Sequence, residues 1–183
     1  MTGLTGVRSS ALTEIHPIPA PLPAPALRVV GRPLPAYRYL PGHGPHPFRH
    51  PDGHLYTDGS APEEVEWVDG PWQEDTEWLW GLDLFDHRYY WESHEVLEAI
   101  WHHVPRQTPL WWMLKGLIQA SAFTLKQHMG QERAADRLLG RSTGLLMQAS
   151  EQLGAVHRGV HMPMLCERLR AFHVGGPWPK IAS

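Results

Sequence analysis

The residues best suited to chemistry lie in one stretch, at positions 89–103. His94 and Glu98 are four residues apart, so a helix with about 3.6 residues per turn places both side chains on one face. Glu92, on the same helix, points away from this face. An imidazole nitrogen and a carboxylate oxygen can together bind zinc, iron, manganese or nickel. The spacing therefore makes His94 and Glu98 the first candidates for a divalent transition-metal site.

Two side chains are too few for a metal site, so further ligands must come from elsewhere. His102 follows Glu98 by another helical turn, whereas His46 and His54 stand in a proline-rich segment far upstream. That segment can bring its histidines to the site only by crossing the helices. These three histidines are therefore weaker candidate ligands.

The same helix and the next one supply side chains that would line a pocket around the pair. Residues three or four apart are neighbours on a helix surface, so aromatic and acidic residues lie beside His94 and Glu98. An amide and a lysine on the next helix would meet the Glu98 carboxylate or a small anionic ligand. The predicted lining residues are Trp91, Glu95, Trp101, Gln119 and Lys126.

The pair has two other interpretations. Glu98 could orient the His94 ring for proton transfer, which is general acid–base chemistry without a metal. Alternatively, the two side chains form a half-buried hydrogen-bonded pair in a structural or interaction domain, because a buried imidazole needs a partner. The spacing does not separate these interpretations from a metal-dependent enzyme that acts on a small polar molecule.

Composition limits the classes of partner. A net charge of −3 over 183 residues gives no support to a nucleic-acid-binding surface. No stretch approaches the about 20 apolar residues of a membrane span. The single cysteine, Cys166, excludes an internal disulfide and fits a reducing compartment. We therefore expect a cytoplasmic protein that binds neither nucleic acid nor membranes, and whose partners are a small polar ligand or further copies of itself.

Proline content divides the chain. Of the 18 prolines, 13 fall at or before Pro71, and a proline-dense segment cannot be helical. We expect a disordered proline-rich tail at residues 1–32 and an irregular strap, rich in aromatic residues, at residues 33–73. A helical domain at residues 74–173 and a C-terminal tail at residues 174–183 follow.

Hydrophobic periodicity and end signals place the helices. Helices are predicted near residues 74–84, 89–103, 108–129, 132–153 and 162–172, and no segment predicts a strand. Thr108 is the expected N-cap of the third helix, with Pro109 at its first position. Short connections favour a compact all-α bundle of four to five helices. Three glycines within these helices indicate close helix contacts: Gly116, Gly140 and Gly144.

The order of residues around His94 resembles a known family signature. His94, three residues, Glu98, two residues and Trp101 resemble the motif of the family catalogued as domain of unknown function 309. The Gly-Leu-Ile-Gln at residues 116–119 and the region at 126–130 resemble the family's second block. Lys115 stands where that block usually has its first glutamine.

The resemblance covers about residues 33–150, since the Pro-Gly and Pro-His-Pro segment of the strap is similar to an N-terminal extension of some members. It implies an all-helical fold of bacterial or archaeal origin. It also implies a metal role for the histidine and glutamate of the motif, but no particular reaction.

Overall fold

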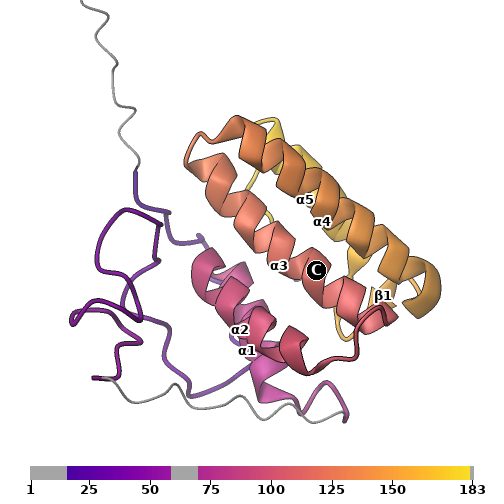
Figure 1. Cartoon of the computed structure of the whole chain (residues 1–183), viewed down its shortest axis with the longest axis horizontal. Helices are drawn as coiled ribbons and strands as arrows, with labels where there is room; N and C mark the ends of the chain where they lie inside the picture. Colours follow the sequence, from indigo (N-terminus) through magenta and orange to yellow (C-terminus); the bar gives the residue numbers. More distant parts are fainter. Residues whose placement is uncertain (1–15, 59–69, 182–183) are drawn as a thin grey trace, which may run out of the picture.

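The computed structural model describes residues 16–58 and 70–181. Within these ranges the chain is predominantly helical, which confirms the predicted all-α class. The elements are α1 Thr76–Asp86, α2 Tyr90–His103, α3 Pro109–His128, α4 Glu132–Leu153, β1 Val156–His157, β2 Val160–His161 and α5 Met162–His173. Figure 1 shows α3 at the centre, between α2 on one side and α4 on the other.

α1 and α3 begin where a side chain caps them. The Asp75 carboxylate accepts the N–H of Trp78 at the start of α1, at 3.0 Å. The Thr108 hydroxyl accepts the N–H of Trp111 at 3.2 Å, directly before Pro109. Each cap satisfies one of the N–H groups that have no partner inside the helix. The N-cap predicted at Thr108 is therefore confirmed.

A short hairpin between α4 and α5 was not predicted. β1 and β2 pair antiparallel, with Val156 opposite His161. The two residues between them, Arg158 and Gly159, have φ values of 47° and 78°, as a two-residue hairpin turn of the I′ type requires. Strands of two residues are too short to give an alternating pattern, so sequence periodicity could not detect them.

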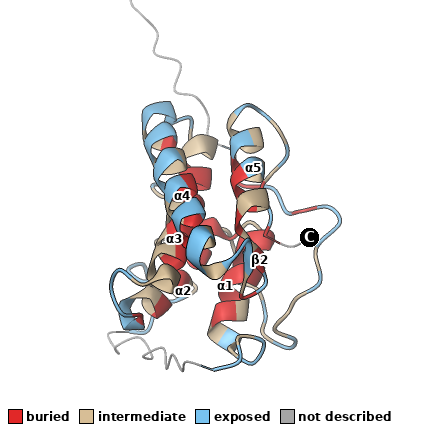
Figure 2. Ribbon diagram, turned by 90° about the vertical axis from the view of Figure 1, so that its right-hand side faces the viewer, coloured by how far each residue is buried: buried red, intermediate tan, exposed pale blue. Residues whose placement is uncertain are grey.

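The core lies between the helices, where the largest fully buried side chains include Trp78, Tyr90, Phe85 and Phe123. Figure 2 shows buried residues on the inward faces of the helices and exposed residues on the outward face of α4. The side chain of Ser93 in α2 donates to the carbonyl of Gly81 in α1 at 2.9 Å. This packing fixes the face that α2 turns to the rest of the bundle.

Of the three glycines predicted to mark close helix contacts, only Gly116 lies at one. A Cβ added at Gly116 would lie 2.8 Å from Cγ of Leu146, closer than side-chain carbons pack. The Ser142 hydroxyl also donates to the Gly116 carbonyl at 2.8 Å. A Cβ at Gly140 or Gly144 would meet nothing within 4 Å, so the expectation for these two positions is wrong.

The segment at residues 16–32 packs on the bundle, whereas we expected it to belong to a disordered tail. Ile18 is buried. The Arg28 guanidinium pairs with Asp83 at 2.8 Å and with Asp86 at 2.7 Å. The backbone N–H groups of Arg28 and Val29 also donate to Asp83. Two acidic residues of α1 thus hold this segment, and the expected tail at residues 1–15 lies outside the described residues.

The C-terminal segment also contacts the helices. The Trp178 ring stacks on the Tyr90 ring with centroids 5.9 Å apart, and Ile181 is buried. The strap lies beside α1 and α2 (Figure 1). The Arg38 side chain donates to the carbonyl of His87 at 2.9 Å. Both proline-containing ends of the chain therefore pack on the end of the bundle where α1 meets α2.

Candidate functional site

The side chain of His94 is held by a contact between α2 and α3. Its Nδ1 atom lies 3.3 Å from the carbonyl oxygen of Ile118. A carbonyl can only accept, so this hydrogen bond requires the proton on Nδ1. Nε2 faces Oε2 of Glu98, 3.7 Å away, and in the neutral ring it carries the lone pair. The two helices therefore fix both the orientation and the tautomer of the ring.

The separation of His94 Nε2 from Glu98 Oε2 suits a shared ion better than a direct bond. A distance of 3.7 Å is too long for a hydrogen bond. Two ligands with bonds of about 2.1 Å to one tetrahedral ion lie about 3.4 Å apart. The two atoms are therefore within ion-pair distance, too far apart for a direct hydrogen bond and close to the separation of two ligands of one ion.

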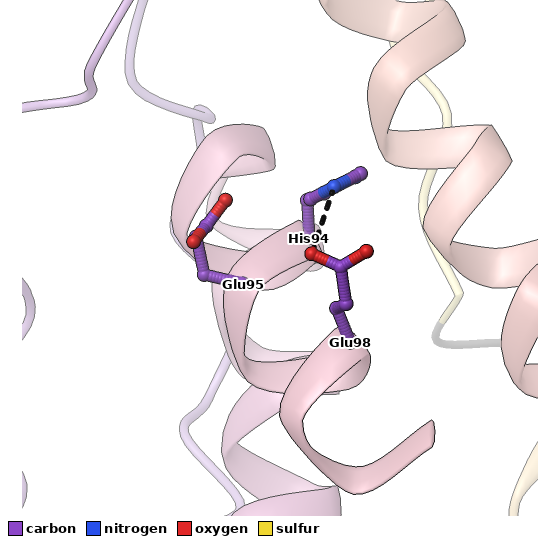
Figure 3. A group of neighbouring side chains, drawn as sticks. All are labelled: His94, Glu95 and Glu98. Carbon is purple, nitrogen blue, oxygen red and sulfur yellow. Dashed lines mark ion pairs between the residues drawn. The ribbon is translucent and has the colours of Figure 1, made fainter. Parts of the chain in front are cut away.

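Glu95 joins these two residues. One ligand atom from each of His94, Glu95 and Glu98 lies within 4.8 Å of the others, and all three residues are partly buried. Figure 3 shows the Glu98 carboxylate beside the His94 ring and Glu95 on the adjoining side of α2. No other such group of three occurs in the described part of the chain. Glu95, predicted only to line the pocket, is thus a third candidate ligand.

The electrostatics of this cluster, His94, Glu95 and Glu98, favour a cation. Burial raises the pKa of Glu95; the His94 ring opposes this, and the Glu98 charge adds to it. A cation between the two carboxylates would remove that repulsion. The side chains of His94 and Glu98 are 25% and 42% exposed, so water or a small ligand can reach the cluster.

The other predicted ligands lie elsewhere. His102 is exposed at the end of α2, and its ring contacts Trp101 with centroids 5.2 Å apart. Trp101 also contacts Trp111 across the α2–α3 connection, and the Lys115 ammonium lies over both rings. The structure therefore places Trp101 in an aromatic group with its own lysine.

Trp91 contacts the strap. Its ring is 5.1 Å from Tyr39, 5.6 Å from His46 and 5.6 Å from Phe48, measured between centroids. His46 therefore packs among aromatic rings and is not a member of the cluster. Trp91 is the main aromatic contact between α2 and the strap.

His54 reaches α2, but at a different residue. Its Nε2 lies 3.4 Å from Oε1 of Glu92, and the two side chains are only 7% and 3% exposed. Glu92, expected only to point away from the His94 face, is buried because the strap covers that side of α2. Glu92 Oε1 also accepts the buried N–H of Tyr39 at 3.0 Å. The buried histidine–glutamate pair of this protein is His54–Glu92.

Burial changes the protonation of this second pair. It raises the pKa of Glu92 to about 7, against the opposing effects of the Tyr39 N–H and of Arg38. It lowers the pKa of His54. Both ring nitrogens of His54 and Oε2 of Glu92 have no hydrogen-bond partner among the described residues. Burial therefore favours the neutral form of both groups.

The two residues predicted from α3 differ. Gln119 follows Ile118, and its Oε1 is buried without a hydrogen-bond partner in the described part. Lys126 is eight residues beyond Ile118, or about 12 Å along the helix, and does not meet Glu98. Only Gln119 lies at the level of His94 in the bundle.

Comparison with known proteins identifies the helical region. Residues 78–138 match the family model described as domain of unknown function (DUF309). No curated protein and no solved structure matches the chain. The matched residues include His94, Glu95 and Glu98 but not the strap, so the match is shorter than the expected 33–150. No helix among the described residues is both long and apolar enough to cross a membrane. The chain thus contains, at residues 78–138, a helical region that matches the DUF309 family model.

Proposed function

We propose that this chain binds one divalent transition-metal ion at His94, Glu95 and Glu98 and uses it on a small polar molecule. The observation that carries the proposal is the contact between His94 Nδ1 and the Ile118 carbonyl. Histidines that bind metals usually donate their other ring N–H to a carbonyl or carboxylate, which turns the free nitrogen toward the metal. His94 has this arrangement.

The donor set fits such an ion. One imidazole nitrogen and two carboxylates suit zinc, manganese or iron. Three protein ligands leave a position for water or substrate, and the partial exposure of His94 and Glu98 keeps that position accessible. A bound ion would supply Lewis acidity.

The chain's own residues would then have separate tasks. His94 and Glu98 hold the ion from one helix, and Ile118 fixes the ring from the next. The buried, unpartnered Oε1 of Gln119 is an acceptor for a polar ligand bound at this level of α3. The reaction itself is not specified by these groups.

Equilibrium dialysis against Zn²⁺ and, separately, Mn²⁺ tests the proposal. We expect one equivalent of metal in the wild-type protein. His94→Ala should weaken binding by at least about 100-fold, because even indirect partners of metal ligands are worth 10- to 100-fold. His102→Ala is the matched control, since it removes an exposed histidine of the same helix.

Two results would reject the proposal. One is the absence of stoichiometric metal from the wild-type protein. The other is an His94→Ala variant that keeps full metal binding. A variant that is merely less stable, in a protein without metal, would favour the structural or interaction domain.

A further inference from the structure

A second candidate site lies apart from the cluster, in a cavity of about 600 Å³ between the two proline-containing ends of the chain. One wall is the segment Pro21–Ala26, and the other is Trp178, Pro179 and Lys180. The floor is formed by residues at the end of α1 and in the turn that follows. None of the metal-site residues lines this cavity.

The acidic groups at this cavity are already neutralised. Asp86 accepts from the Arg28 guanidinium at 2.7 Å and from the N–H of Ile181. Arg28 is also bound to Asp83. The cations that remain are Arg88 and Lys180, and neither forms an ion pair with a described residue. The cavity therefore has an excess of positive charge.

Arg88 has a strained backbone conformation and a guanidinium that is only partly hydrogen-bonded. Its φ of 65° lies in the left-handed region, which costs a residue other than glycine free energy. Nη1 donates to the carbonyls of Pro19 and Ala20 at 3.2 and 3.4 Å, and the guanidinium lies 5.0 Å from the centroid of the Trp178 ring. Nε and Nη2 donate to no described residue.

This guanidinium is partly buried and forms no ion pair with a residue that the structure describes. Burial lowers the pKa of Arg88, and the nearby Arg38 charge lowers it further. An arginine nevertheless stays protonated at neutral pH. A desolvated charge without an opposite charge is costly, and an anion in the cavity would remove that cost through the two free donors of the fork.

We propose that this cavity binds the carboxylate or phosphate group of a small molecule, with Arg88 as the main ligand and Lys180 as the second. The prolines and Trp178 would contact the apolar part of that molecule. This site is independent of the proposed metal site, and it would give the protein a second ligand of opposite charge.

The indole N–H resonance of Trp178 provides the test. Inorganic phosphate and, separately, succinate are titrated into ¹⁵N-labelled protein at constant ionic strength, and Trp178→Phe assigns the resonance among the nine tryptophans. We expect a saturable shift with a Kd of about 1 mM or below for at least one probe. Arg88→Gln should weaken binding at least about tenfold, and Lys180→Gln by a few fold.

Three controls keep the result specific. Arg141→Gln removes an exposed cation of α4 and should leave binding unchanged. His94→Ala should also leave it unchanged, which separates this site from a metal-bound anion. Arg88→Lys keeps the positive charge but loses the paired N–H donors of the guanidinium, so this variant should bind the anion more weakly than the wild type does. The proposal fails if neither probe gives a saturable shift, or if Arg88→Gln binds as the wild type does while its other indole resonances show a folded protein.

Discussion

The two histidine–glutamate pairs of this protein use the same side chains under opposite conditions. His94 and Glu98 belong to one helix and are 25% and 42% exposed, whereas His54 and Glu92 join the strap to that helix and are 7% and 3% exposed. The exposed pair keeps a lone pair and a carboxylate accessible to an ion. The buried pair has both groups shifted toward neutrality, which suits a structural contact.

The comparison shows that residue type alone does not decide the environment of such a pair. Packing from other elements decides it: a carbonyl that orients the ring at His94, and a strap that excludes water at Glu92. Glu95 lies between the pairs on α2, since its charge helps to raise the pKa of Glu92 and its own pKa is raised in part by Glu98.

The largest expected effect distinguishes the pairs by stability. Glu92→Ala removes the acceptor of the buried Tyr39 N–H and leaves His54 buried without its partner. We expect a loss of about 3 kcal/mol in the free energy of unfolding, measured by urea denaturation. Glu98→Ala, at the exposed pair, should cost less than about 1 kcal/mol. Equal losses would show that the burial difference has no energetic consequence.

Metal should stabilise the protein through the exposed pair alone. A ligand that binds only the folded state, at 100 times its Kd, adds about 2.7 kcal/mol to the free energy of unfolding. We expect an increase of that size on adding Zn²⁺ or Mn²⁺ to the wild-type protein and to His54→Gln, but none with His94→Ala. If His54→Gln also lost the increase, the buried pair would have to take part in binding.

The pH dependence of stability should reveal the buried pair. Folded Glu92 keeps its proton up to about pH 7, whereas an unfolded glutamate loses it near 4.5. The folded state then binds more protons, so the free energy of unfolding falls as the pH rises through this window. Folded His54 has a pKa below the ordinary 6.5, so its contribution is present above about pH 6.5 and is lost as the pH falls.

These two contributions oppose each other in the wild-type protein, and single variants separate them. Measured against the double variant His54→Gln/Glu92→Gln, which retains the other titrating groups, His54→Gln isolates the Glu92 contribution and should be more stable at about pH 5 than at about pH 7, by roughly 2 kcal/mol. Glu92→Gln keeps only the His54 contribution and should show the reverse slope. Urea denaturation at both pH values measures this, and slopes of the same sign would contradict the assignment.

The smallest effect concerns the exposed pair without metal. Glu98→Gln and His102→Ala should each change the free energy of unfolding by less than about 0.5 kcal/mol. Calorimetry of the metal-free proteins measures this. A larger loss for Glu98→Gln would mean that the carboxylate supports the fold directly.

Much of the fold could be predicted because its signals are local. The observed α4, Glu132–Leu153, has the predicted bounds, and α3 starts after the predicted cap at Thr108. The attachment of residues 16–32 could not be predicted from local composition. It depends on Arg28 meeting Asp83 and Asp86 more than 50 residues away.

For the site, too, the local features could be predicted and the long-range contacts could not. A spacing of four residues was enough to place His94 and Glu98 together, and Glu95 followed from the same helix. The hydrogen bond from His94 to the Ile118 carbonyl and the burial of Glu92 are long-range contacts that helical projection cannot show. The strap did carry a signal for the burial of Glu92. Its four aromatic residues between positions 37 and 56 are expected to pack against another part of the protein.

Side-chain ¹⁵N NMR of the histidine rings, with and without one equivalent of Zn²⁺, tests the central claim most directly. The His94 resonances are assigned as those missing from the spectrum of His94→Ala. The account predicts that the His94 ring keeps its proton on Nδ1 and that its Nε2 resonance shifts when metal is added. The His54 ring should not respond. A His94 ring with its proton on Nε2 and no response to metal, or a response at His54 instead, would contradict it.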